Sequence, residues 1–277
     1  MLNVLRTQLF RLKKSKLFWA MFIVCAVLPF VGMLFTTALL SFLVSVFSGE
    51  VGGALSALRS EGGRITMSAF NGLASLGSTP VLFSIICSSI FLSGEFSGGA
   101  IRNMVLANKS RTQIFLSFFS VALIIGFACF GAAYVSTLTF YGAIVGFGGV
   151  TVSQAVSGCF SAMFLGMLSI ALAQACVCLF LFVTRKTGAT VAFPLLIIIL
   201  APSLISAVVD IVAGLKLLVG QSVSATTLSW IPLYNMDMFN AAAVDGAIVG
   251  KIALYNVPLA AIFATLGWLA IYKADLK

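Results

Sequence analysis

Residues 95–111 gather one acidic and several basic side chains in a single polar stretch between two long apolar stretches. Glu95 stands at the start of this stretch, Arg102 in its middle and Arg111 at its end. Such groups can form ion pairs with one another or with a partner protein, and Glu95 can also favour the positive N-terminus of a short helix. The stretch predicts a short amphipathic helix that contacts a partner, and a solvated basic loop is the alternative.

Enzymatic and metal chemistry have little support in the rest of the chain. It contains no His, so the side chain most often used as a general base and metal ligand is absent. The cysteines all fall within apolar stretches, which is typical of small packing residues rather than of disulfides or zinc ligands. We therefore expect no catalysis by this chain and no bound metal or cofactor. The cysteines are Cys25, Cys87, Cys129, Cys159, Cys176 and Cys178.

The composition places the elements that carry these residues in a membrane. Of the 277 residues, 61% are hydrophobic and 8% are charged, whereas soluble domains have about 45–50% apolar and 25% charged residues. So few charges cannot cover a water-facing surface, which excludes a soluble globular protein. We expect an all-α polytopic membrane protein whose residues 1–277 form a single transmembrane domain.

Six apolar stretches are long enough to cross a bilayer as helices, which takes about 20 residues each. They cover approximately residues 17–47, 74–94, 113–141, 158–183, 189–211 and 252–272. Several prolines lie inside or beside them, so kinks are expected.

The basic residues predict the orientation, because cytoplasmic loops carry an excess of Lys and Arg. With the N-terminus inside, twelve of the 16 basic residues fall in cytoplasmic segments and four fall outside. We therefore expect both termini in the cytoplasm. The cytoplasmic set is Arg6, Arg11, Lys13, Lys14, Lys16, Arg102, Lys109, Arg111, Arg185, Lys186, Lys273 and Lys277, and the external set is Arg59, Arg64, Lys216 and Lys251.

The N-terminal segment, residues 1–16, combines basic residues with a leucine stripe at Leu2, Leu5, Leu9 and Leu12. Spacings of three and four residues predict an amphipathic helix along the inner membrane surface, and an ordinary basic flank with accidental leucine spacing is the alternative. The apolar run that follows is too long for a secretory signal, so we expect this segment to be retained.

Residues 95–111 resemble the permease subunits of the type-2 ABC exporter family. In that family an acidic residue after the second span is followed by Gly-Thr, then Ile-Arg-Asn, and later Ser-Arg. Two positions depart from the pattern, since Ala100 stands where Thr is usual and Phe118 where a Lys often follows Ser117. The basic N-terminal helix, six spans and a long external region before the sixth span also match. The matching residues are Glu95, Gly99, Ile101, Arg102, Asn103, Ser110 and Arg111.

The resemblance implies that residues 95–112 form a coupling loop, which docks on a separate ATP-binding subunit and passes its closure to the spans. It assigns this coupling to Glu95, Gly99, Arg102, Asn103, Ser110 and Arg111. ATP and Mg²⁺ are then bound by the partner, and a second permease subunit completes a homodimer or heterodimer. This chain has no phosphate loop of its own, because residues 246–252 have the wrong glycine spacing and lack the Ser or Thr.

Two further regions hold candidate functional residues. The external region 212–251 holds Trp230, Tyr234 and Asn235, and the resemblance implies re-entrant helices there, so these three are candidate gate residues. Intramembrane polar residues mark pathways by default, which makes Gln174 and Asp210 candidates for the translocation path. A hydrogen bond between helices for Gln174 and an exposed external position for Asp210 are the alternatives.

The resemblance as a whole implies the membrane-spanning subunit of an ATP-driven exporter in the plasma or inner membrane. A charge-poor interior suits an amphipathic or hydrophobic substrate, such as a peptide, an antibiotic or drug, or a lipid-like molecule. Membrane lipids are expected contacts and nucleic acid is not. An ATP-independent carrier or channel is one alternative, and a membrane immunity protein that binds a toxin or peptide without transport is another.

Overall fold

The computed structural model of the chain describes residues 2–46, 79–99, 104, 110–144, 152–201, 204 and 246–273. These residues are helical apart from short turns, and no strand occurs among them. The elements are α1 (Leu2–Lys14), α2 (Lys16–Val46), α5 (Thr79–Ser97), α7 (Arg111–Ile144), α8 (Val152–Thr184), α9 (Thr187–Leu195), the π-helical turn η1 (Leu196–Leu200) and α11 (Gly246–Lys273).

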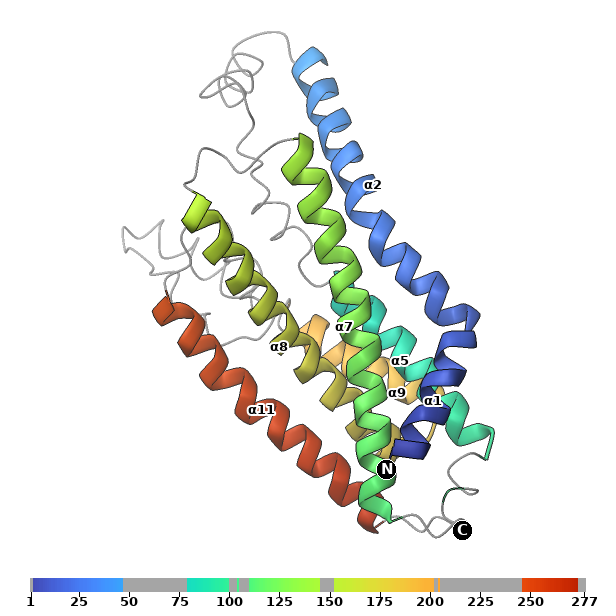
Figure 1. The fold of residues 1–277 in the computed structure, drawn as a ribbon. Helices are drawn as coiled ribbons and strands as arrows, with labels where there is room; N and C mark the ends of the chain where they lie inside the picture. The colour runs from blue at the N-terminus through green and yellow to red at the C-terminus, as the bar shows by residue number, and fades with distance from the viewer. Residues whose placement is uncertain are drawn as a thin grey trace.

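The helices form one elongated bundle with α7 and α8 at its centre (Figure 1). Helix α2 packs on α7, α11 packs on α8, and α5 and α9 contact both each other and α8. At the lower end of Figure 1, α1 lies near the end of α5, the start of α7 and the end of α11. The polar stretch identified in the sequence begins and ends at this same end of the bundle.

The described helices fit a membrane protein in length and composition. Four of them are long and apolar enough to cross a bilayer, and a fifth joins them if the bent pair α1 and α2 counts as one span. Residues 187–200 form a shorter apolar helix at the start of the fifth expected stretch. The described residues therefore confirm an all-α architecture with four or five candidate membrane-spanning helices. The count of six spans stays a prediction.

The boundaries of several elements differ from those expected. Helix α5 continues through Ser97, so Glu95 lies in its last turn rather than in a loop. Helix α11 begins at Gly246, six residues before the sixth expected stretch, so residues 246–251 are helical. Both differences arise because a helix continues past the apolar stretch that identifies it.

The N-terminal segment forms a separate helix, and α1 meets α2 at an angle of 66°. Leu12 is buried and Leu5 and Leu9 are half-buried against the core, as the leucine stripe predicts. Val4 and Gln8 are also buried, so the face that packs is broader than the stripe. Helix α1 thus packs its apolar face on the bundle and leaves its basic residues exposed.

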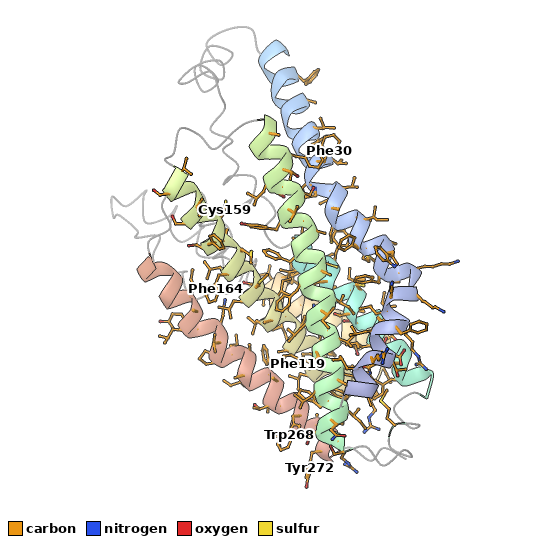
Figure 2. The ribbon with its side chains drawn as sticks, viewed as in Figure 1. Phe30, Phe119, Cys159, Phe164, Trp268 and Tyr272 are labelled. Atoms are coloured by element: carbon orange, nitrogen blue, oxygen red, sulfur yellow. The ribbon has the colours of Figure 1, made fainter. Side chains whose placement is uncertain are left out.

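All six cysteines are free, and all but Cys159 are buried. They pack among the helices of the core, as expected for small apolar side chains. Cys159 is only partly buried and lies near the start of α8 (Figure 2).

Candidate functional site

The polar stretch leaves α5 through a glycine turn. The N–H of Gly98 donates to the carbonyl of Gly94 at 2.9 Å, and the N–H of Gly99 donates to the carbonyl of Phe96 at 3.2 Å. Gly99 has a φ of 71°, a left-handed conformation that glycine adopts without the steric penalty of a Cβ. The family resemblance marks Gly99 as a coupling residue, and the structure gives it a backbone role: it ends α5 and turns the chain.

Glu95 lies just before this turn and is paired with α1. Its Oε2 accepts a hydrogen bond from Nη1 of Arg11 at 2.7 Å, and about 10% of the Glu95 side chain is exposed against 53% for Arg11. The pair joins residues that are far apart in sequence, and Glu95 is the single acidic residue in the part of the chain that the structure describes. Arg102, the partner suggested by the sequence, lies outside the described residues.

Four phenylalanines pack against one another and form what we call the aromatic cluster: Phe96 of α5, which follows Glu95, Phe115 and Phe118 of α7, and Phe182 of α8. The ring centroids of Phe96 and Phe182 are 5.5 Å apart, and those of Phe118 and Phe182 are 5.9 Å apart. Such edge-to-face pairs add about 0.5–1.5 kcal/mol each beyond burial. The cluster ties three helices together next to the ends of the polar stretch.

The aromatic cluster also accounts for one departure from the family pattern. Phe118 stands where a Lys is often found, and its side chain is completely buried. A lysine ammonium at this position would be surrounded by aromatic rings with no water, so phenylalanine is the residue that fits this bundle.

The polar stretch ends at Ser110, which caps the start of α7. Its hydroxyl accepts a hydrogen bond from the N–H of Gln113 at 3.3 Å, and its carbonyl accepts one from the N–H of Ile114 at 3.1 Å. A serine in this position satisfies backbone donors that the first helical turn leaves unpaired. Ser110 therefore fixes the point at which the stretch returns to the bundle.

Arg111 joins this point to the last helix. Its guanidinium donates to the carbonyls of Ile271, at 3.4 Å, and of Tyr272, both in the final turn of α11. The Trp268 indole N–H donates to the Thr112 hydroxyl at 3.2 Å, and Figure 2 places Trp268 and Tyr272 beside the start of α7. A cation is favourable at a helix C-terminus, so Arg111 holds α7 and α11 together.

Gln174 lies inside the helical core, completely buried. Its Nε2 donates to the Ser84 hydroxyl of α5 at 3.1 Å, and its side chain is packed so closely against α7 that a Cβ on Gly126 would come within 3.1 Å of it. Gln174 thus makes an interhelical hydrogen bond, and whether it also lines a translocation path stays a prediction.

The remaining candidates lie outside the described residues. These are Arg102 and Asn103 of the polar stretch, Asp210, and the gate candidates Trp230, Tyr234 and Asn235. Among the described residues, no group of His, Cys, Asp or Glu side chains could hold a metal ion.

Three parts of this site were not predicted from the sequence. In the sequence Arg11 is one basic residue among several, and the phenylalanines of the aromatic cluster belong to a generally apolar composition. Nothing in the sequence marks the contact between Trp268 and Thr112. One signal could have pointed to Arg11: a lone acid near a helix end requires a nearby cation when it is buried. Comparison with known proteins adds no assignment, since no family model matches the chain and no curated protein matches its sequence.

Proposed function

We propose that this chain is the membrane-spanning subunit of an ATP-driven exporter that resembles the type-2 ABC family. One observation carries the proposal: each end of the polar stretch 95–111 is fastened to a different helix. Its first residue, Glu95, pairs with Arg11 of α1, and its last residue, Arg111, binds the final turn of α11. A loop that only connects two spans does not require contacts to other helices at both of its ends.

This anchoring suits a segment that transmits force. A partner that moves the stretch pulls directly on α5 and α7, because the stretch connects them. The same displacement reaches α1 through Arg11 and α11 through Arg111. In the proposed mechanism, ATP-driven closure of a separate subunit acts on Arg102 and Asn103, and the bundle responds as one body. ATP and Mg²⁺ are held by that subunit, and hydrolysis takes place there.

The charges at this end fit the proposed orientation. The exposed basic residues of α1 and of the α8–α9 turn, Arg185 and Lys186, lie at the same end of the bundle as the polar stretch. An excess of positive charge marks the cytoplasmic side. We place both termini there, in a chain of six spans that works as a dimer and exports an amphipathic or hydrophobic substrate.

Purification of the tagged chain from its native membrane in a mild detergent tests the proposal. Mass spectrometry is expected to find a soluble ATP-binding-cassette protein in roughly equal amount. Its reproducible absence, with the chain intact, would favour the carrier, channel or immunity alternatives.

A matched pair of variants locates the contact. Arg102→Ala together with Asn103→Ala is expected to reduce recovery of the ATP-binding protein. Lys186→Ala removes a basic residue from another turn at the same end. The amount of ATP-binding protein recovered with this variant is expected to equal the amount recovered with the unaltered chain. Equal loss in both variants would mean general charge attraction rather than docking on the polar stretch.

A further inference from the structure

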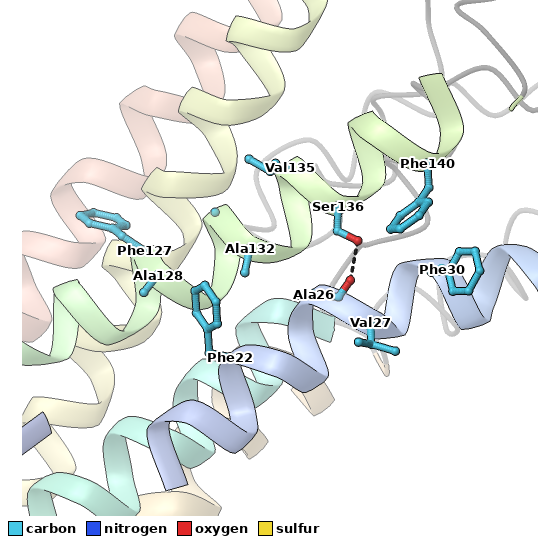
Figure 3. Close-up of a pocket in the computed structure, with 11 residues that line it drawn as sticks. Phe22, Ala26, Val27, Phe30, Phe127, Ala128, Ala132, Val135, Ser136 and Phe140 are labelled. Carbon is cyan, nitrogen blue, oxygen red and sulfur yellow. Dashed lines mark hydrogen bonds between the residues drawn. The ribbon is translucent and has the colours of Figure 1, made fainter. Parts of the chain in front are cut away.

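An apolar groove of about 690 Å³ runs between α2 and α7 (Figure 3). Aromatic side chains from both helices form its walls and small residues form its floor. Pockets of roughly 300–1,000 Å³ hold small organic ligands, so the groove is large enough for one. It is lined by Phe22, Ala26, Val27, Phe30, Phe127, Ala128, Gly131, Ala132, Val135, Ser136 and Phe140.

The lining determines what kind of molecule fits. Among the described residues of the lining, Ser136 has the single polar side chain, and its hydroxyl already donates to the carbonyl of Ala26. The described side chains of the groove therefore offer a ligand no free hydrogen-bond donor. An occupant must be apolar along its whole length here, as a hydrocarbon chain is.

The groove also has two different ends. At the end away from α1, the rings of Phe30 and Phe140 pack with centroids 4.7 Å apart and close it. At the other end, Phe22 lies against Trp19, with ring centroids 5.9 Å apart. Phe22 and Phe30 are separated by about 12 Å at a helical rise of 1.5 Å per residue, which is within one bilayer leaflet of about 15 Å.

Trp19 connects this end of the groove to a basic turn. Its indole N–H donates to the carbonyl of Lys13 at 2.8 Å, and Lys13, Lys14 and Lys16 are all exposed at the junction of α1 and α2. Among the described residues no acidic side chain neutralises these lysines, because Glu95 is engaged with Arg11. Three positive charges thus stand near the end of the apolar groove that lies closer to α1, and the Lys14 ammonium also lies 4.5 Å from the centroid of the Phe10 ring.

We propose that this groove holds one acyl chain of an anionic phospholipid, whose phosphate group lies over Lys13, Lys14 and Lys16. The charge of the turn selects an anionic headgroup, since basic sites beside membrane helices attract such lipids. A second copy of this chain in a symmetric contact would bring a like-charged turn to the same place. The inference needs only that the bundle is embedded in a membrane and does not depend on ATP-driven export.

Trp19 provides the reporter for a test, because it touches both the basic turn and the groove wall. The reference protein carries Trp230→Phe and Trp268→Phe, which leaves Trp19 as the sole tryptophan. It is reconstituted in phosphatidylcholine vesicles that contain a minority of phosphatidylglycerol brominated in the acyl chains. The comparison uses the same fraction of brominated phosphatidylcholine, and quenching of Trp19 fluorescence is measured.

Brominated phosphatidylglycerol is expected to quench Trp19 at several-fold lower mole fraction than brominated phosphatidylcholine. Each lysine replaced by Gln is expected to weaken this preference by up to about fivefold. Equal quenching by the two lipids would overturn the proposal and indicate ordinary annular lipid. Absence of quenching by either lipid, in a protein that elutes as a dimer, would indicate that a second copy covers the groove.

A pair of glycine variants separates the groove from the charged turn. Gly131 lines the groove and Gly188 lies in α9, and a Cβ at either position would meet nothing within 4 Å. Both Gly131→Leu and Gly188→Leu are therefore expected to fold. The preference for phosphatidylglycerol is expected to fall several-fold in Gly131→Leu and to persist in Gly188→Leu. A preference that survives Gly131→Leu would place the lipid at the surface lysines only, and the groove assignment would be wrong.

Discussion

At the scale of the residue, the Glu95 carboxylate is stabilised by a partner that lies far away in the sequence. It is nearly buried, and a carboxylate in that position requires a cation. Arg11 supplies the cation from α1. Because Arg11 itself is half exposed, the pair contributes about 0.2–1 kcal/mol rather than the larger values of fully buried pairs.

A double-mutant cycle measures this coupling. Arg11→Gln and Glu95→Gln are each expected to lower the thermal stability of the detergent-solubilised protein slightly, and the double variant to lose less than their sum. The expected interaction energy is about 0.2–1 kcal/mol. Strict additivity would mean that Arg11 and Glu95 do not interact in the folded protein.

Phe118 offers a stronger test, because its ring is completely buried in the aromatic cluster. Phe118→Ala leaves a cavity, and such changes cost up to about 3–5 kcal/mol in well-packed cores. Phe164→Ala is the matched control, since Phe164 of α8 is 53% exposed (Figure 2). The melting temperature is expected to fall clearly for Phe118→Ala and little for Phe164→Ala. An equal fall in melting temperature for the two variants would contradict the tight packing of Phe118 in the aromatic cluster.

The sequence identified Glu95, Ser110 and Arg111 as residues of interest but not what they contact. Charge type and spacing are local properties, and they are visible in the sequence. The partners Arg11, Ile271 and Tyr272 are brought close only by the packing of whole helices, and in a single sequence nothing records that packing. Gln174 shows the same limit: its polarity marks it, whereas Ser84 as its partner appears only in the bundle.

At the scale of the element, helix positions were largely predictable and helix contacts were not. Long apolar stretches predict both bounds of α2 and α7 within three residues, because a membrane helix must be apolar over its length. They also predict the end of α8, whereas α8 begins at Val152, six residues before the expected stretch. The short turn at Arg185 and Lys186 likewise follows from two basic residues between apolar stretches. Contacts between helices depend on small residues that allow close approach. The chain has 25 glycines, so the sequence does not show which of them lie at helix contacts.

Gly267 marks one such approach, between α11 and α8. A Cβ there would lie 3.3 Å from the backbone N and Cα of Leu179 and 3.2 Å from the Phe115 ring. Gly267→Ala is expected to destabilise the protein by about 1 kcal/mol, because overpacking against backbone outweighs the gain in helix propensity. A Cβ at Gly188 would meet nothing within 4 Å, so Gly188→Ala is expected to leave the melting temperature unchanged or to raise it. Thermal melts in detergent compare the two, and a more stable Gly267→Ala would show that α11 and α8 are loosely packed.

At the scale of the whole molecule, the basic helix α1, the start of α7, the turn between α8 and α9 and the end of α11 lie at one end of the bundle (Figure 1). Helix α5 ends there too, with Glu95 in its last turn. We expect this charged end to face the cytoplasm, because cytoplasmic segments carry an excess of positive charge. The sequence predicts the same side from its basic residues, and the structure adds that these residues are gathered in space.

Cysteine labelling of intact cells tests this orientation. In a Cys159→Ala background the other native cysteines are buried, so maleimide labelling reports on the introduced cysteine. An impermeant maleimide is expected to label Val152→Cys, at the 81% exposed start of α8, and to label Ser110→Cys only after the membrane is opened. The reverse pattern would place the polar stretch outside the cell.

Photo-cross-linking from the polar stretch tests the central claim most directly. A benzophenone amino acid replaces Asn108, a residue of the stretch that is not assigned to coupling. The native membranes are irradiated, and the adduct is identified by mass spectrometry. The proposed function predicts an ATP-binding-cassette subunit in the adduct from position 108, and none from the same probe at Val152. An efficient adduct from position 108 that contains only lipid or unrelated protein would contradict coupling to an ATPase through this stretch.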